Sequence, residues 1–422
     1  MKKKNCDAVV IGAGSAGLAA AAEISRRGHS VILLEREPAP GGILNQCIHN
    51  GFGLTRFREE LTGPEYAERE IKILAQCSAE LYTGITVTRI EENGTEKHVY
   101  AFSSAKGMIV FTARAVILAM GCRERNRGNI GTPGTRPAGV FTAGLAQRLV
   151  NIDGYIPGRE CVIVGSGDIG LIMARRMTWI GAEVKAVIEI QPYPAGLTRN
   201  IVQCLNDFSI PLYLSHVVSR IYGKDRVEGV DITPLKNGLE NYSETFRISC
   251  DTLLLSVGLI PDNEVSKTCG IEINHETNGA YVNADLMTSV DGVFACGNVL
   301  HVHDLVDFVS EEAARCGAYA SDYIESKGVK KEFPVSAGGN VKYIIPNKYT
   351  PEHDNLFYLR SLIVKNNASL VASAGGKELY RKKLQHVQPS EMLQFTLTKE
   401  QVQDIQMLGD NTLTVGIESG EE

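Results

Sequence analysis

Short apolar runs alternate with glycine-rich turns and alanine-rich stretches in the first part of the chain. Residues 8–11 predict a buried strand, residues 18–27 a helix, and residues 30–34 a second strand. The turn before the helix reads Gly12-Ala-Gly-Ser-Ala-Gly17, and Glu35 ends the second strand. This order of strand, Gly-x-Gly-x-x-Gly turn, helix, strand and acid is typical of a βαβ unit that binds a dinucleotide.

Each glycine of this turn has its own physical task. Gly12 permits the tight turn, Gly14 lets the backbone approach a pyrophosphate, and Gly17 lets the helix pack closely on the strand. The helix N-terminus offers N–H groups and the positive end of its dipole to phosphates. We expect the Glu35 carboxylate to accept hydrogen bonds from ribose hydroxyls.

The same pattern occurs a second time further along the chain. Residues 161–164 predict a strand, Gly165-Ser-Gly-Asp-Ile-Gly170 the turn, residues 171–179 a helix, and residues 184–188 a strand that Glu189 ends. Two such units predict two bound dinucleotides. The alternative is a degenerate second lobe that packs but binds nothing.

The acid of the second unit bears on which dinucleotide binds there. Glu189 favours a ribose 2′-hydroxyl and repels a 2′-phosphate, and the following Gln191, Pro192 and Tyr193 supply no arginine to bind a phosphate. The sequence therefore predicts NAD(H) in preference to NADP(H).

The pattern changes after Lys331, where short β-like runs replace the strand–helix alternation. Gly375-Gly376 between two of the runs is a hairpin signal. We expect a small β-rich C-terminal domain over residues 332–422. The runs are residues 341–345, 356–359, 369–374, 392–397 and 412–415.

Composition and charge exclude several classes of protein. Hydrophobic residues make up 44% of the chain, and its net charge is −6, so extensive disorder and the basic surface needed for nucleic acid or anionic membranes are not expected. The basic start at Met1–Lys4 is followed by a strand and a helix rather than by a secretory signal, and no apolar run is long enough to span a membrane. We expect a cytoplasmic protein with reduced cysteines.

Three further segments extend the pattern beyond the two turns. Residues 115–121, 251–261 and 288–298 each join an apolar strand to a glycine, and the last ends in Gly297-Asn298. Together with the two turns they resemble the two-dinucleotide-binding flavoproteins of the pyridine nucleotide–disulfide oxidoreductase superfamily. The resemblance implies an α/β fold with two Rossmann-like domains, FAD in the first and NAD(H) in the second.

The resemblance also implies domain limits. A discontinuous FAD domain is expected over residues 1–120 and 260–328, a crossover segment over 121–154, and an inserted NAD(H) domain over 155–258.

The same resemblance assigns cofactor-binding positions. Asn298 stands where the family usually has Asp against the ribityl chain, and it keeps an acceptor oxygen. The positions implied for FAD are Gly12, Gly14, Ser15, Ala16, Gly17, Glu35, Arg36, Gly42, Val87, Gly121, Gly297 and Asn298. Those implied for NAD(H) are Gly165, Gly167, Asp168, Gly170 and Glu189.

Three segments resemble a narrower group within this superfamily. They are residues 42–53, residues 121–125 with 132–142, and residues 298–304. These segments look like bacterial flavoproteins that are part of larger dehydrogenases, including proteins associated with anaerobic glycerol-3-phosphate dehydrogenases. Subunits of opine oxidase and of hydrogen cyanide synthase are more distant relatives. The resemblance implies a partner flavoprotein dehydrogenase subunit together with a small cysteine-rich electron carrier.

The candidate catalytic residues are Cys47, His49 and His303. Disulfide reductases carry Cys-x-x-Cys or Cys-x-x-x-x-Cys, whereas this chain has neither spacing, so a local dithiol relay is excluded. Cys47 beside a flavin can act as a thiolate whose pKa His49 lowers; the alternative is a packed small side chain.

His303 belongs to a short histidine-rich motif that precedes a predicted helix. His301-Val-His303-Asp304 imitates a set of metal ligands. Because such ligands are uncommon beside a flavin, no metal is expected there.

These observations predict an FAD-dependent oxidoreductase that transfers hydride between NAD(H) and flavin and exchanges electrons with a partner redox protein. Two alternatives stay open. One is a substrate-oxidising amine or opine dehydrogenase subunit that uses no nicotinamide. The other is a non-enzymatic, FAD-bearing assembly subunit. The terminal substrate and the direction of electron flow do not follow from the sequence.

Overall fold

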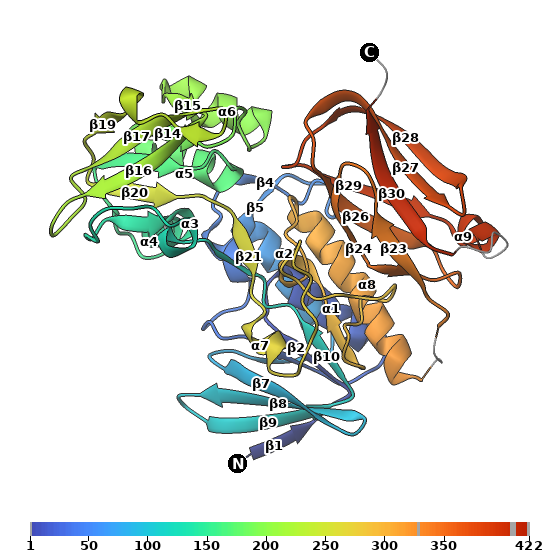
Figure 1. Cartoon of the computed structure of the whole chain (residues 1–422). Coiled ribbons are helices and arrows are strands. Elements are labelled where there is room, and N and C mark those ends of the chain that lie inside the picture. Colours follow the sequence, from blue (N-terminus) through green and yellow to red (C-terminus); the bar gives the residue numbers. More distant parts are fainter. Residues whose placement is uncertain (1, 327–329, 406–410, 420–422) are drawn as a thin grey trace. The chain divides into compact units, whose positions relative to one another are not determined.

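A computed structural model of the chain describes residues 2–326, 330–405 and 411–419 (Figure 1). The chain divides into two compact units, one formed by residues 1–122 and 261–422 and the other by residues 123–260. The chain passes from the first unit to the second within β11 (Cys122–Glu124) and returns within β21 (Leu259–Pro261). The expected domain ends at residues 328 and 422 lie outside the described residues.

A parallel sheet with the strand order β22-β10-β2-β3-β6 forms the core of the first unit. Every residue of β2, β3 and β10 is buried, because helix residues such as Leu18 and Ala313 and residues of a neighbouring sheet such as Val99 share one core cluster with them. Ile11 pairs with both Leu34 and Leu118, so these strands end together at one edge of the sheet. The strands are β2 (Ala8–Ile11), β3 (Val31–Leu34), β6 (Glu80–Tyr82), β10 (Ala115–Leu118) and β22 (Val293–Ala295).

Helices α1 (Ser15–Arg26) and α8 (Val306–Ile324) pack closely together in this unit (Figure 1). A Cβ on Gly317 of α8 would lie 2.7 Å from the carbonyl oxygen of Ala20, so the small residues of both helices permit the approach. Helix α2 (Gly63–Ala75) begins with a capping box, in which Thr62 N–H donates to Glu65 Oε2 at 2.8 Å.

A second sheet of the first unit has the order β1-β9-β8-β7. Its strands are β1 (Lys2–Asn5), β7 (Thr86–Asn93), β8 (Glu96–Ser103) and β9 (Gly107–Ala113). Shorter elements connect the sheets: η1 (Gly42–Gln46), β4 (Asn50–Phe52), β5 (Leu61–Thr62), α7 (Glu264–Lys267) and η4 (Gly297–Val299).

The second unit repeats the parallel architecture with the strand order β12-β20-β13-β14-β15. An antiparallel sheet, β16-β17-β18 with β19 beside β17, lies in the same unit. The strands are β12 (Val140–Thr142), β13 (Glu160–Val164), β14 (Glu183–Glu189), β15 (Leu212–Leu214), β16 (His216–Tyr222), β17 (Gly229–Lys236), β18 (Leu239–Glu240), β19 (Phe246–Ile248) and β20 (Thr252–Leu255). The helices are α3 (Arg127–Ile130), α4 (Ala143–Asn151), α5 (Asp168–Trp179), α6 (Thr198–Cys204), η2 (Asn206–Phe208) and η3 (Tyr242–Glu244).

Most of the expected crossover segment, residues 121–154, is part of the second unit. Strand β12 pairs with β20, and Ala143 and Ala146 of α4 are buried in the same cluster as Leu171. The two alanines are one helical turn apart and so face the core together. In the sequence this short apolar stripe is flanked by many Gly, Arg and Pro residues, which is why the segment was predicted to be a connection and not part of a domain.

The end of the chain forms two packed sheets, β25-β23-β30-β27-β28 and β24-β26-β29 (Figure 1). Phe357 and Phe395 stack within their common core at a ring-centroid distance of 5.1 Å. The elements are β23 (Phe333–Ala337), β24 (Val341–Ile345), β25 (Lys348–Tyr349), β26 (Asn355–Ser361), β27 (Lys365–Ala374), β28 (Lys377–Val387), β29 (Met392–Leu397), α9 (Lys399–Ile405) and β30 (Leu413–Ser419). The expected α/β fold, with two Rossmann-like sheets and a β-rich C-terminal part, is confirmed.

None of the helices in the described residues has both the length and the apolar character needed to cross a membrane.

Candidate functional site

The first glycine-rich turn joins β2 to α1 with very little space between them. Gly12 has φ of +99°, and a Cβ on Gly17 would lie 1.7 Å from the Gly12 carbonyl oxygen. Beside Gly14, by contrast, a Cβ would meet no atom of the described residues within 4 Å, and none of their side chains caps α1. The turn therefore has both the space and the uncapped helix end that a pyrophosphate requires, and so fits FAD.

Glu35 is buried at the end of β3 and is held by two backbone groups. Its Oε2 accepts from the N–H of Ala13 at 2.7 Å, and its Oε1 accepts from the N–H of Glu37 at 2.8 Å. Each carboxylate oxygen can accept a second hydrogen bond, so Glu35 keeps the capacity to bind ribose hydroxyls.

Two distant segments converge on the first turn. A Cβ on Gly42 would lie 3.1 Å from Cα of Gly14, and a Cβ on Gly297 would lie 2.9 Å from Cβ of Ala16. Ser15 is the first residue of α1. The structure thus brings Gly42 and Gly297, two of the positions that the resemblance implied for FAD, next to the first turn.

Three other predicted FAD positions lie in other segments of the first unit. Arg36 is exposed after β3, and Val87 lies in β7, where it pairs with Ala101. Gly121 follows the end of β10 with φ of +73°. Contacts with the first turn like those of Gly42 and Gly297 do not single out these three positions among the described residues. Their role in FAD binding stays a prediction.

Asn298 is already engaged by protein groups. Its Oδ1 accepts the backbone N–H of His303 at 3.0 Å, and its Nδ2 donates to Sγ of Cys122 at 3.7 Å. The acceptor oxygen that the sequence assigned to the ribityl chain therefore also orders the loop after η4. Sequence reasoning missed Cys122, because its contact with Asn298 joins residues far apart in the chain.

The turn of the second unit has the same close packing. A Cβ on Gly170 would lie 2.6 Å from the Gly165 carbonyl oxygen, whereas around Gly167 the nearest atom would be 4.0 Å away. Asp168 begins α5, and its Oδ1 accepts from the N–H of Leu197 and from Nδ2 of Asn200. Asp168 therefore also holds the segment after β14 in place, and the open space at Gly167 fits a second pyrophosphate.

Glu189 is buried at the end of β14 and matches Glu35 in its position. Its Oε2 accepts from both N–H and Oγ of Ser166, at 2.8 and 2.6 Å, and its Oε1 accepts from the N–H of Gln191 at 2.9 Å. A negative charge is thus fixed where the sequence expected the ribose of NAD(H).

Cys47 and His49 follow η1 and are half-buried. The Cys47 thiol donates to the carbonyl of Ile43 at 3.3 Å, and burial raises its pKa to about 12. The His49 ring contacts Phe52 at 5.0 Å and its Nδ1 lies 3.0 Å from the carbonyl oxygen of Asn50. Burial therefore shifts the Cys47 pKa opposite to the direction expected of an activated thiolate.

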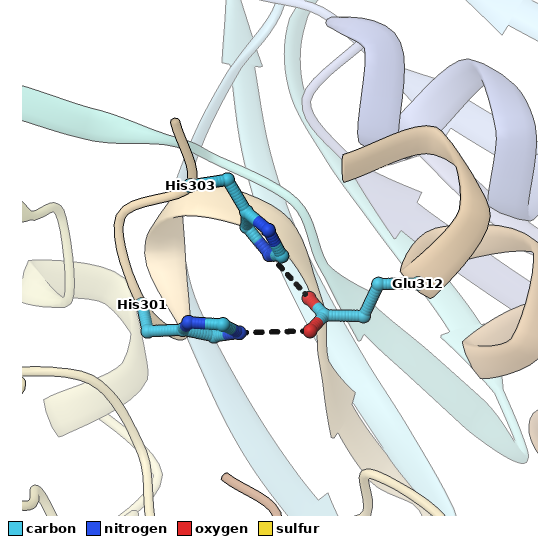
Figure 2. A group of neighbouring side chains, drawn as sticks. All are labelled: His301, His303 and Glu312. Atoms are coloured by element: carbon cyan, nitrogen blue, oxygen red, sulfur yellow. Dashed lines mark hydrogen bonds and ion pairs between the residues drawn. The ribbon is translucent and has the colours of Figure 1, made fainter. Parts of the chain in front are cut away.

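His303 lies in a buried cluster with His301 and Glu312 (Figure 2). His301 Nε2 donates to Glu312 Oε2 at 2.8 Å, and His303 Nε2 lies 3.3 Å from Glu312 Oε1. Burial lowers the pKa of His301 to about 4. Burial alone would raise the pKa of Glu312, but the two histidines hold it below its usual range.

Asp304, the carboxylate nearest to the histidines in sequence, points elsewhere. It pairs with Arg360, and its Oδ2 accepts from the N–H of Met392 at 2.6 Å. Glu312 enters the cluster from α8 instead, and only the folding of the loop back onto that helix brings it there. The sequence predicted a helix after the histidines, but nothing in it linked Glu312 of that helix to them.

Comparison with known proteins identifies a family. The family described as pyridine nucleotide-disulphide oxidoreductase matches residues 6–320. An opine oxidase subunit of Agrobacterium tumefaciens (strain Ach5) is 25% identical over 311 residues, which are 69% of this chain and 61% of that protein. Thioredoxin reductase of Bacillus subtilis is 26% identical over 302 residues, 71% of this chain and 88% of that protein. The match therefore spans less than two thirds of the opine oxidase protein but most of the thioredoxin reductase.

Solved structures agree on the fold. Thioredoxin reductase of T. acidophilum superposes with a TM-score of 0.62 at 23% identity, covering 77% of this chain and 100% of that one. The bacillithiol disulfide reductase Bdr of Bacillus cereus gives a TM-score of 0.62 at 15% identity, covering 76% and 100%. The family match ends at residue 320, before β23.

Proposed function

The chain belongs to the pyridine nucleotide-disulphide oxidoreductase family, and from this premise we propose that it is an FAD-dependent NAD(H) oxidoreductase that exchanges electrons with a separate redox protein. Bound FAD would supply the hydride and electron chemistry, while the protein supplies binding, orientation and electrostatics. The observation that carries the proposal is the pair of turns, each with open space at its middle glycine and a buried glutamate on the next strand.

The roles of this chain's own residues follow from their contacts. The uncapped ends of α1 and α5 would bind the two pyrophosphates, and Glu35 and Glu189 would orient the two riboses. Gly42 and Gly297 leave room at the first turn for the rest of the FAD molecule.

The need for a separate redox protein rests on the cysteines. All ten are free thiols, and Cys47 has no second cysteine in its segment. The next cysteine in sequence, Cys77, packs against α1, where its Sγ lies 3.8 Å from the carbonyl oxygen of Ala22. A partner flavoprotein subunit or a small cysteine-rich carrier is therefore the proposed electron acceptor or donor, in a cytoplasmic complex resembling glycerol-3-phosphate dehydrogenase.

A second candidate function is a substrate-oxidising subunit of the opine or amine dehydrogenase type that uses no nicotinamide. The resemblance to a protein named as part of an opine oxidase supports it. The buried Glu189, which is held as Glu35 is held, favours the nicotinamide-dependent function instead.

Anaerobic reduction of the purified, FAD-loaded protein separates these functions. We expect NADH to remove the flavin absorbance and NADPH to do so far more slowly. Direct reduction by glycerol 3-phosphate, an amino acid or an opine, with none by NADH, would favour the second function. A protein that takes up no FAD would contradict both.

A further inference from the structure

The cluster of His301, His303 and Glu312 has the composition of a metal site. Two imidazoles and one carboxylate are a common ligand set for Zn²⁺. One donor atom from each residue can be chosen so that all three lie within 4.8 Å of one another, and all three residues are buried. Figure 2 shows both imidazoles directed at the carboxylate of Glu312.

The hydrogen bonds within the cluster leave several ring nitrogens unused. Among the described residues, Nδ1 of His301 and Nδ1 of His303 have no hydrogen-bond partner, and Nε2 of His303 makes a long ion-pair contact of 3.3 Å with Glu312 Oε1 rather than a hydrogen bond. Buried polar atoms are normally paired, so unpaired nitrogens of this kind call for an unseen partner.

The spacing of the donors suits an ion. Two ligands of a tetrahedral zinc ion at the usual bond lengths lie about 3.3 Å apart. His303 Nε2 and Glu312 Oε1 are separated by 3.3 Å, and His301 Nε2 and Glu312 Oε2 by 2.8 Å. An ion that replaces the proton between His301 and Glu312 would widen that pair by roughly 0.5 Å, and donor atoms up to 4.8 Å apart would close toward the ion by small side-chain rotations.

The surroundings favour a small coordination number. Tyr358 packs against both imidazoles, with ring-centroid distances of 5.3 Å to His301 and 5.2 Å to His303. An octahedral ion would need several water ligands, which such an enclosed site does not favour, whereas a tetrahedral ion needs one further ligand. From the sequence no metal was expected at these histidines, and it offered Asp304 rather than Glu312 as their third ligand. With Glu312 in place, we propose that His301, His303 and Glu312 bind one Zn²⁺ ion.

The position of the site indicates what the ion does. Glu312 Oε1 also accepts the backbone N–H of Gly297 at 2.6 Å, and Gly297 lies against Ala16 at the first turn. A zinc ion would therefore tie helix α8, the loop after η4 and the Gly297 turn together. Zinc binding should raise the melting temperature and, insofar as the proposed FAD site is right, tighten FAD binding as well.

The test begins with the untagged full-length protein, dialysed against a chelator and then given Zn²⁺. After removal of the excess we expect about one zinc ion per chain by mass spectrometry, because the described residues hold one cluster with three protein ligands, which leaves the fourth position to water. Crystals of this protein should give an anomalous difference peak between the three side chains at the zinc absorption edge. Absence of the peak, or zinc bound elsewhere, overturns the proposal whether or not FAD binds.

Variants give an independent test in solution. His303→Ala should weaken zinc binding about 100-fold or more and abolish the rise in melting temperature on adding zinc. The matched control is His386→Ala, because His386 is exposed and its Nδ1 contacts Asn366 at 2.8 Å, outside the cluster. Equal zinc affinity of the His303 variant and wild type would contradict the site. If the His303 variant does not fold, the anomalous peak of the wild-type crystal decides.

Discussion

Glu189 accepts two hydrogen bonds from Ser166, one from its backbone N–H at 2.8 Å and one from its hydroxyl at 2.6 Å. In the first unit Ala13 occupies the matching position and donates only its backbone N–H to Glu35, at 2.7 Å. The two glutamates proposed to bind ribose are thus held by the same backbone contact, and Glu189 accepts one further hydrogen bond, from the Ser166 hydroxyl. A rigid, buried carboxylate is a strong barrier to a 2′-phosphate.

Removing the charge of Glu189 should change the choice of nicotinamide. In Glu189→Ala the ribose contact and the repulsion of the 2′-phosphate are both lost, so the ratio of kcat/KM for NADH over NADPH should fall by about 10- to 100-fold. Rates of anaerobic flavin reduction by the two nucleotides measure this ratio. Glu183→Ala is the control, because Glu183 lies on the same strand and pairs with Lys185 on the surface. An unchanged ratio would refute the role proposed for Glu189.

Two glycines of the first turn should respond differently to the same substitution. A Cβ on Gly17 would overlap the Gly12 carbonyl oxygen at 1.7 Å, so Gly17→Ala should unfold the first unit or lower its stability by several kcal/mol (~3 or more). Gly14→Ala should fold, since nothing lies within 4 Å, but the added methyl occupies the proposed pyrophosphate space.

Circular dichroism and bound FAD distinguish these two outcomes. The Gly14 variant should keep the melting curve of the wild type with FAD affinity reduced about 10-fold or more. A Gly14 variant that binds FAD normally would show that the pyrophosphate does not lie there.

The thiol of Cys47 should be unreactive at neutral pH. Its pKa is raised to about 12, so the protonated form predominates and the thiolate fraction at pH 8 is roughly 0.01%, against about 10% for a thiol of pKa 9. Alkylation by iodoacetamide, followed by peptide mass spectrometry, should therefore be slow and rise only toward pH 12.

Cys47→Ser should accordingly leave the transfer of electrons from NADH to an artificial dye largely intact. A loss of about 100-fold, or roughly 2.7 kcal/mol in barrier height, would instead make Cys47 a redox residue.

Arg360 ties the C-terminal sheets to the loop before α8. It pairs with Asp304 and donates to the carbonyls of Val302 at 3.1 Å and Ser390 at 2.6 Å. Arg360→Ala removes these contacts and leaves the Asp304 carboxylate without its cation, so it should cost about 3 kcal/mol of stability. Arg381→Ala is the control: its pairs with Glu378 and Glu418 are exposed, so the expected cost is about 0–1 kcal/mol. Denaturant unfolding measures the free energy of unfolding of both variants. Equal losses would contradict a stabilising role of the Arg360 contacts.

The local pattern of the sequence was sufficient for the elements that carry the dinucleotide turns. The buried strands β2, β3, β13 and β14 and the glycine spacings are properties of short segments, because backbone geometry and burial on both faces of a parallel sheet impose them. In the C-terminal part, residues 341–345 and 392–397 were predicted with the bounds that β24 and β29 have.

Strand β28 was missed for a local reason. Most of its residues are exposed, five of the eleven are charged, and it lies at the edge of its sheet, so neither a hydrophobic run nor a regular alternation marks it. The pairing with β27 decides its conformation.

The contacts that define the candidate sites were decided by tertiary structure alone. Glu312 replaces Asp304 beside the two histidines because α8 turns its carboxylate toward the loop, while Arg360 from a distant strand draws Asp304 away. The thiol pKa of Cys47 likewise depends on burial by residues that its own segment does not contain. Sequence spacing determines which chemical groups are near in the chain, whereas the packing of distant elements determines which of them meet and how far they are removed from water.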